Sequence, residues 1–117
     1  MTEKMQYQRW LDFPLEDPAL KEELLSIKDK DEEIFDRFYQ ELAFGTAGLR
    51  GVLGAGTNRM NIYTVRKATQ GMADYLNEKY PHSSIAISYD SRINSRLFAE
   101  ETARVMAANG ITAYLYD

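Results

Sequence analysis

The stretch that decides the fold begins at Ile85-Ala86-Ile87-Ser88-Tyr89, a short run rich in β-forming side chains. Residues 97–109 then have helical spacing, Gly110 suits a helix stop, and residues 111–116 are β-branched and aromatic. This order predicts strand, helix, strand. A crossover of this length joins parallel strands in a right-handed sense, and helices normally cover both faces of such a sheet.

The residues before this unit predict helices. Thr2 is an N-cap for a helix to about residue 13, and Asp17 followed by Pro18 opens a second through residue 27. A third helix runs from residue 31 to about 42, with an acidic first turn that we interpret as a solvated face and not as a metal site. A fourth is capped by Asn61 and ends at Pro81.

Five of the seven glycines lie between Gly45 and Gly56, a density that predicts a shaped loop. Within it, the glycines of residues 44–51 allow backbone N–H groups to approach an anion, and Arg50 offers a planar fork of donors to a phosphate. A tight connector with a solvent-facing arginine fits the composition equally well. Nucleotide motifs fail, because Thr57 stands where a Walker lysine is needed and Arg59 where a third Rossmann glycine is needed. ATP and NAD are therefore disfavoured.

Residues 89–92, Tyr-Asp-Ser-Arg, follow the first predicted strand at its carboxyl end, where open α/β sheets bind ligands. Asp90 suits a loop-ordering or helix-capping role, and Arg92 can pair with it or with a phosphate. Ser91 is a weak nucleophile candidate, because the only histidine, His82, lies before the strand. A Ser-His-Asp triad finds no support.

Charge is distributed unevenly along the chain. Residues 1–44 carry 6 basic and 12 acidic side chains, a net charge of −6, whereas the remainder carries 8 and 6, a net charge of +2. The two parts are expected to face different partners. Spaced arginines usually occupy solvated helix faces, and with a pI near 5.0 this argues against nucleic-acid binding. These arginines are Arg59, Arg66, Arg96 and Arg104.

The composition also bears on the compartment. With no cysteine, disulfide frameworks, thiolate metal clusters and thiol nucleophiles are excluded, and the cytoplasm is the expected location. The sequence has no apolar run of membrane-spanning length and no targeting segment, so a membrane partner is not expected.

Several ordered motifs resemble the start of an α-D-phosphohexomutase. The resemblance runs from about residue 37 to residue 117, and the helical lead-in with Gly-Thr-Ala-Gly-Leu-Arg-Gly is similar to the phosphoglucomutase and phosphopentomutase branch. The stretches that carry it are residues 44–51, 58–61, 65–71 and 89–92, with Ser95 and Phe98.

The resemblance implies a four-domain enzyme that moves a phosphoryl group between two sugar hydroxyls, using a phosphoserine, Mg²⁺ and a glucose 1,6-bisphosphate intermediate. Arg50 matches the family's first-domain arginine beside the phosphoserine, where it would neutralise charge on the phosphoryl oxygens. The loop would be shaped by Gly45, Thr46, Gly48 and Gly51 and supported by Asp90 and Arg92. The family's Thr-Ala-Ser-His-Asn-Pro serine loop and Asp-Gly-Asp-x-Asp-Arg metal loop do not occur in these residues.

We therefore expect an α/β chain, with a helical N-terminal extension over residues 1–43 and an incomplete three-layer α/β/α domain I over residues 44–117. That domain has a small mixed or parallel sheet and ends before the phosphoserine loop. The expected function is that of an N-terminal fragment, itself inactive, of a cytoplasmic phosphoglucomutase acting on glucose 1-phosphate and glucose 6-phosphate. The alternatives are a phosphomannomutase or phosphopentomutase, and a stand-alone phosphate-binding or interaction domain. Exposed strand edges predict self-association of the piece.

Overall fold

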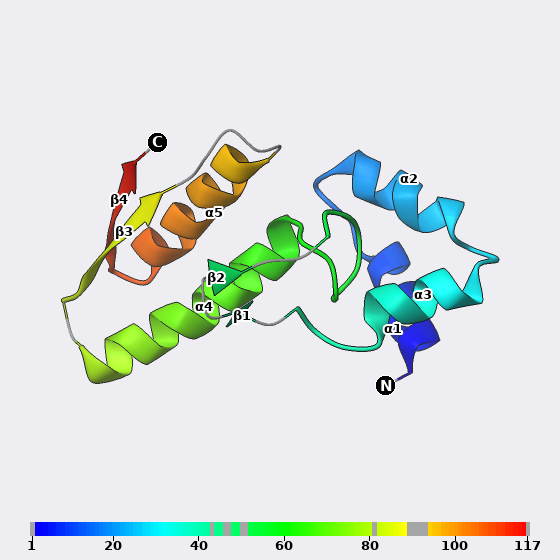
Figure 1. Ribbon diagram of the computed structural model, residues 1–117, viewed down its shortest axis with the longest axis horizontal. Helices are drawn as coiled ribbons and strands as arrows, with labels where there is room; N and C mark the ends of the chain where they lie inside the picture. The colour runs from blue at the N-terminus through cyan, green and yellow to red at the C-terminus, as the bar shows by residue number, and fades with distance from the viewer. Residues whose placement is uncertain are drawn as a thin grey trace. The chain divides into compact units, whose positions relative to one another are not determined.

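The computed structural model describes residues 2–42, 44–45, 48–49, 52–80, 82–88 and 94–116. The chain forms two compact units, Met1–Thr64 and Val65–Asp117, with their boundary inside one helix. The elements, labelled in Figure 1, are α1 Glu3–Asp12, α2 Pro18–Ser26, α3 Asp31–Phe38, β1 Phe44–Gly45, β2 Gly48–Leu49, α4 Ile62–Lys79, β3 Ser84–Ser88, α5 Ser95–Ala108 and β4 Thr112–Tyr116.

The three predicted N-caps, Thr2, Asp17 and Asn61, are confirmed, whereas α5 begins at Ser95, two residues before the predicted start. The Thr2 side chain accepts a hydrogen bond from the Met5 amide at the start of α1, and the Asp17 side chain accepts one from Ala19 at the start of α2. At α4, Asn61 Oδ1 accepts from the amides of Tyr63 and Thr64, both at 3.0 Å. Each cap satisfies amides that have no partner inside the helix.

Helix α3 is shorter than predicted, because it ends at Phe38 and not near residue 42. In a longer helix the Arg37 carbonyl would accept from the amide four residues on. Here that carbonyl accepts from the Asn58 amide at 2.9 Å, and the Leu42 amide donates to the Thr57 carbonyl at 2.8 Å. Thr57 and Asn58 therefore form hydrogen bonds with groups that a further turn of α3 would otherwise use.

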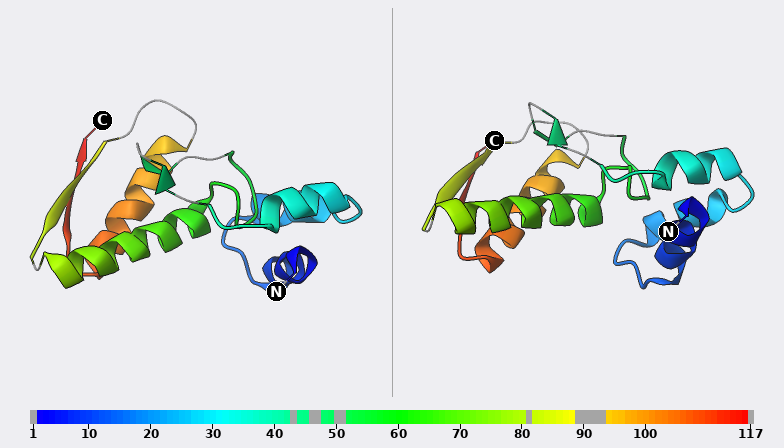
Figure 2. Two further views of the ribbon diagram at one scale, coloured as in Figure 1. Left: turned by 60° about the horizontal axis from the view of Figure 1, so that its bottom comes forward. Right: turned by 90° about the horizontal axis from the view of Figure 1, so that it is seen from below.

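The helices of the first unit, α1, α2 and α3, lie close together (Figure 2), and buried apolar side chains from them form a core of this unit. Trp10 lies edge-on to both Phe38 and Tyr63, which ties α1 to α3 and to the start of α4. Ala55, from the glycine-rich region, is fully buried in the same core. The buried members are Tyr7, Leu20, Leu24, Ile27, Ile34, Phe38 and Ala55.

The second unit contains the predicted strand, helix and strand. β3 and β4 pair in parallel, with Ile85 opposite Ala113, and α5 packs along them. Gly110 follows α5 with φ +76°, a conformation that favours glycine and confirms the predicted helix stop. The buried core members are Ala73, Met106 and Ile111, from α4, α5 and the start of β4. The chain is thus α/β, helical with a small two-stranded parallel sheet.

Helices were expected on both faces of this sheet, and among the described residues of the second unit they cover one face. The face with Ile85 and Ala113 packs on the helices. Tyr114 and Tyr116 alternate to the opposite face and are 52% and 57% exposed. The two helices of this unit, α4 and α5, both contribute to the core on the covered face.

In the described part of the chain, no helix is both long and apolar enough to cross a membrane.

Candidate functional site

The glycine-rich region contains a small antiparallel pair that the prediction of a loop missed. Phe44 pairs with Leu49 and Gly45 pairs with Gly48, which makes β1 and β2 the two sides of a hairpin. Two of the predicted phosphate-loop residues, Gly45 and Gly48, are therefore brought face to face.

The other predicted site residues lie outside the described part of the chain. These are Thr46, Arg50 and Gly51 in the glycine-rich stretch and Asp90 and Arg92 after β3. Their roles stay predictions. What the structure does describe is the segment on each side of them: β2 before Arg50 and residues 52–61 after it, and β3 before Asp90.

Residues 52–61, which we call the return loop, are held closed by their own hydrogen bonds. The Met60 amide donates to the Val52 carbonyl at 2.8 Å, and the Gly54 amide donates to the Met60 carbonyl at 3.2 Å. The Asn61 side-chain amide donates to the carbonyls of Gly54 and Gly56, at 2.8 and 3.1 Å. Asn61 thus fixes the return loop with its nitrogen while its oxygen caps α4.

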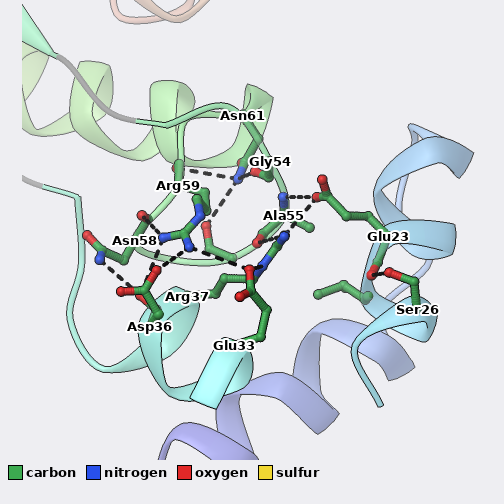
Figure 3. A network of polar contacts seen from close by, with 12 residues as sticks. Glu23, Ser26, Glu33, Asp36, Arg37, Gly54, Ala55, Asn58, Arg59 and Asn61 are labelled. Atoms are coloured by element: carbon green, nitrogen blue, oxygen red, sulfur yellow. Dashed lines mark hydrogen bonds and ion pairs between the residues drawn. The ribbon is translucent and has the colours of Figure 1, made fainter. Parts of the chain in front are cut away.

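Two helices of the first unit grip the return loop at Ala55 (Figure 3). Glu23 of α2 accepts a hydrogen bond from the Ala55 amide, and Arg37 of α3 donates from Nη1 to the Ala55 carbonyl at 3.2 Å. Glu23 and Arg37 also pair with each other, Oε2 to Nη1, at 3.0 Å. A single ion pair therefore satisfies both polar groups of one buried peptide residue.

Arg59 makes a second attachment, drawn in Figure 3 beside the first. Its Nη2 pairs with the Asp36 carboxylate, and its Nη1 donates to the Asn58 carbonyl at 3.0 Å. The side chain is only 9% exposed, so the prediction that Arg59 occupies a solvated helix face is wrong. The reason is that Arg59 lies in the return loop and not on a helix, and it turns toward the carboxyl groups of α3.

The acidic first turn of α3 is only partly the solvated face that we predicted. Asp31 and Glu32 are exposed. Glu33 is half-buried, and its carboxylate pairs with Arg37 Nε at 3.1 Å and lies 3.9 Å from Arg59 Nη2. The Glu33–Arg37 spacing of four residues was a signal for this pair. Nothing local in the sequence pointed to Glu23.

In the second unit, a buried carboxylate lies between two arginines. Glu101 of α5 accepts from Arg66 Nε and from Arg104 Nη1, both at 2.8 Å. The hydrogen bond from Arg66, opposed by burial and helped by the charges of both arginines, lowers the pKa of Glu101. Arg96 and Arg104 are exposed as predicted, whereas Arg66 is partly buried.

The described residues do not fit a metal ion such as Mg²⁺. Across the described ranges, histidine, aspartate and glutamate side chains form no group of three or more that could hold a metal. Glu23 and Asp36 of the first unit instead pair with arginines.

Comparison with known proteins places these features in a family. The profile of "Phosphoglucomutase/phosphomannomutase, alpha/beta/alpha domain I" matches residues 41–117, a range that contains the hairpin, the return loop and the second unit. No solved structure matches the chain significantly.

Curated relatives agree with this match. The chain is 45% identical over 87 residues to a phosphoglucomutase of Staphylococcus saprophyticus, covering 74% of this chain and 16% of that protein. It is 45% identical over 80 residues to one of Staphylococcus haemolyticus, covering 68% and 15%, and 42% identical over 90 residues to one of Staphylococcus aureus, covering 77% and 16%. The chain thus spans less than a fifth of the length of these relatives. On the strength of the domain match, the chain belongs to the phosphoglucomutase/phosphomannomutase family.

Proposed function

We propose that this chain is the domain I part of a phosphoglucomutase that interconverts glucose 1-phosphate and glucose 6-phosphate. The observation that carries the proposal is the domain I match over residues 41–117, because this range contains the glycine-rich stretch with Arg50. The hairpin supports it, since Gly45 and Gly48, two of the residues predicted to shape the phosphate loop, lie opposite each other in the ladder.

In this proposal the glycine-rich stretch binds the phosphoryl group that is transferred. Gly45, Thr46, Gly48 and Gly51 shape the loop, and Arg50 places its guanidinium donors on the phosphoryl oxygens. Transfer between hydroxyls concentrates negative charge on these oxygens, and a fixed arginine stabilises that charge. Asp90 and Arg92, after β3, support the loop and do not contact substrate.

The family resemblance extends the proposal beyond these residues. It adds a phosphoserine, Mg²⁺ and a glucose 1,6-bisphosphate intermediate, none of which is assigned to a described residue. We further propose a cytoplasmic location, on the absence of cysteine. Because the serine and metal motifs do not occur in these residues, we propose that residues 1–117 alone do not catalyse the interconversion.

Glucose is preferred over other sugars in this proposal because the relatives described above are named phosphoglucomutases. The family description itself includes phosphomannomutases. An assay of the complete gene product with glucose 1-phosphate, mannose 1-phosphate and ribose 1-phosphate separates these choices. Faster turnover of the mannose or ribose compound would overturn the assignment to glucose.

The phosphate site is tested on the chain itself. Titration of inorganic phosphate into ¹⁵N-labelled residues 1–117 should shift the amides of the glycine-rich stretch, and Arg50→Gln should weaken the affinity by about tenfold. Unchanged affinity in Arg50→Gln would contradict the proposed site. A reading frame that continues past residue 117 into a serine loop supports the mutase, whereas a stop codon there favours a stand-alone phosphate-binding domain.

We also propose that the isolated chain self-associates through strand edges. Across the described residues β3 and β4 pair only with each other, so each presents an unpaired edge, and exposed tyrosines flank the β4 edge. Light scattering should show a mass that rises with concentration. A constant monomer mass at millimolar concentration would rule this out.

A further inference from the structure

We propose that the helices before residue 41 position the phosphate loop, and that Glu23 and Arg37 are the positioning residues. This inference rests on the proposed function, because it assigns a role toward the same loop. Both residues precede the range matched by the family's domain I, which begins at residue 41. The helices before residue 41 would then help to position the phosphate-binding residues, in addition to extending the fold.

The first observation is that Glu23 and Arg37 together bond both backbone polar groups of Ala55. Its amide donates to Glu23 and its carbonyl accepts from Arg37, while the two side chains also pair with each other. Ala55 is fully buried, so a lost bond would leave a buried polar group without a partner. The return loop is thereby bound to α2 and α3 in one orientation.

The second step is the close approach of the two backbones at Gly56. A Cβ at this position would lie 2.7 Å from the Arg37 carbonyl oxygen and 2.8 Å from Arg37 Cβ. No side chain fits between the return loop and α3, and the φ of +130° also favours glycine. Arg37 therefore contacts the return loop through its main chain as well as its guanidinium.

The third step links the return loop to Arg50. In the sequence only Gly51 stands between Arg50 and Val52, a separation of at most about 7 Å between Cα atoms. The Val52 carbonyl is held by the Met60 amide at 2.8 Å, inside the return loop that Glu23 and Arg37 fix. Fixing this end of the glycine-rich stretch limits the positions open to Arg50. Such preorganisation raises anion affinity without a new contact to the anion.

A purely structural role for the pair is the competing explanation, and a matched control separates the two. Tyr7 lies in the same core and donates to the Leu24 carbonyl, and no described hydrogen bond joins its hydroxyl to the return loop. Tyr7→Phe keeps the aromatic ring and removes only the hydroxyl, so it lowers the stability of the first unit but leaves the bonds of Ala55 to Glu23 and Arg37 in place.

The experiment measures inorganic phosphate affinity and amide hydrogen exchange on the whole chain for Arg37→Gln, Glu23→Gln and Tyr7→Phe, at a temperature where each variant is folded. Arg37→Gln should weaken phosphate binding by about tenfold and speed exchange in β2 and the return loop. Glu23→Gln, whose amide oxygen still accepts from Ala55, should weaken it by about threefold. Arg37→Lys should restore part of the affinity, and Tyr7→Phe should leave both readouts unchanged.

The outcomes distinguish the two proposals. If Arg50→Gln weakens phosphate binding but folded Arg37→Gln and Glu23→Gln bind as the parent chain does, the positioning role is wrong and the proposed site stands. Equal losses in Tyr7→Phe would also overturn the positioning role, since stability alone would explain them. If Arg50→Gln binds phosphate normally, the proposed site fails and the positioning role falls with it. Should Arg37→Gln not fold, the Glu23→Gln result decides.

Discussion

The two units use arginine and carboxylate pairs in opposite ways. In the first unit the two arginines that bind the return loop are mostly buried, with Arg37 12% and Arg59 9% exposed, while the carboxylate of Asp36 is 61% exposed. In the second unit the carboxylate of Glu101 is buried at 6% and Arg104 is 67% exposed. The first arrangement places donors inside the protein and the second places an acceptor there.

This difference determines what each cluster does. A buried guanidinium brings several donors, and Arg37 and Arg59 use theirs on backbone carbonyls of the return loop as well as on carboxylates. A buried carboxylate only accepts, and Glu101 joins α4 to α5 through side chains alone. The first cluster therefore fixes a loop, whereas the second fastens two helices.

The largest effect is expected from a substitution at Gly56, where the return loop lies against α3. Gly56→Ala should destabilise the first unit by about 3 kcal/mol, because the new Cβ meets the Arg37 backbone and the φ of +130° is strained for alanine. Urea unfolding followed by the fluorescence of Trp10, the sole tryptophan, reports on this unit.

Gly71→Ala is the matched control for that substitution. Gly71 lies within α4, and a Cβ there meets nothing within 4 Å. The substitution should stabilise the helix by about 0.5–1 kcal/mol, as measured by thermal melting. Destabilisation of similar size in both variants would show that the close approach of Gly56 to α3 is not the cause.

The next effect compares one arginine from each cluster. Arg37→Gln should cost about 2 kcal/mol, since it leaves the Ala55 carbonyl without its partner and Glu23 without its counter-charge. Arg104→Gln should cost at most about 0.5 kcal/mol, because Arg104 is largely exposed and Glu101 keeps Arg66. Urea unfolding followed by circular dichroism measures both. Similar losses in the two variants would remove the distinction between the clusters.

The parts of the fold that depend on neighbouring residues were predictable from the sequence. The caps at Thr2, Asp17 and Asn61 bond amides two or three residues away, so their sequence signals are sufficient. The end of α3 was not predictable, because the Arg37 carbonyl bonds an amide 21 residues downstream. The same holds for the grip on Ala55, where Glu23 bonds a residue 32 positions away.

In the candidate site, too, the features set by neighbouring residues were predictable and those set by distant residues were not. The density of glycines around Gly45 and Gly48 indicated special backbone geometry, and the structure shows those two residues paired. Composition contained no information on the pairing itself, because a two-residue ladder has no periodicity to detect. Arg59 was misassigned for a related reason: burial of an arginine depends on carboxylates supplied by another element, here Asp36 of α3.

A smaller, pH-dependent effect is expected at Glu101. Its lowered pKa in the folded chain means that its contribution is fully present above the unfolded-state pKa and is lost as the pH falls through the folded one. Glu101→Gln should cost about 1–2 kcal/mol at pH 7, where the charged hydrogen bonds are intact. The gap between the parent and variant stabilities should narrow toward pH 3, as measured by urea unfolding. A gap independent of pH would show that the charge of Glu101 contributes nothing.

The smallest effect lies at the opposite end of the pH scale, in the first unit. Burial, with a contribution from the charge of Asp29, raises the pKa of the Tyr7 hydroxyl, which donates to the Leu24 carbonyl. A raised pKa means that the stabilisation is present below the unfolded-state value of about 10 and is lost as the pH rises through the folded value. Tyr7→Phe should cost about 1 kcal/mol at pH 7 and should approach the parent stability above pH 10. If the parent chain and Tyr7→Phe lose stability in parallel from pH 9 to 11, groups other than Tyr7 cause the loss of stability at high pH. If the curves converge, the first unit is alkali-sensitive through a neutral donor, while the second is acid-sensitive through a charged acceptor.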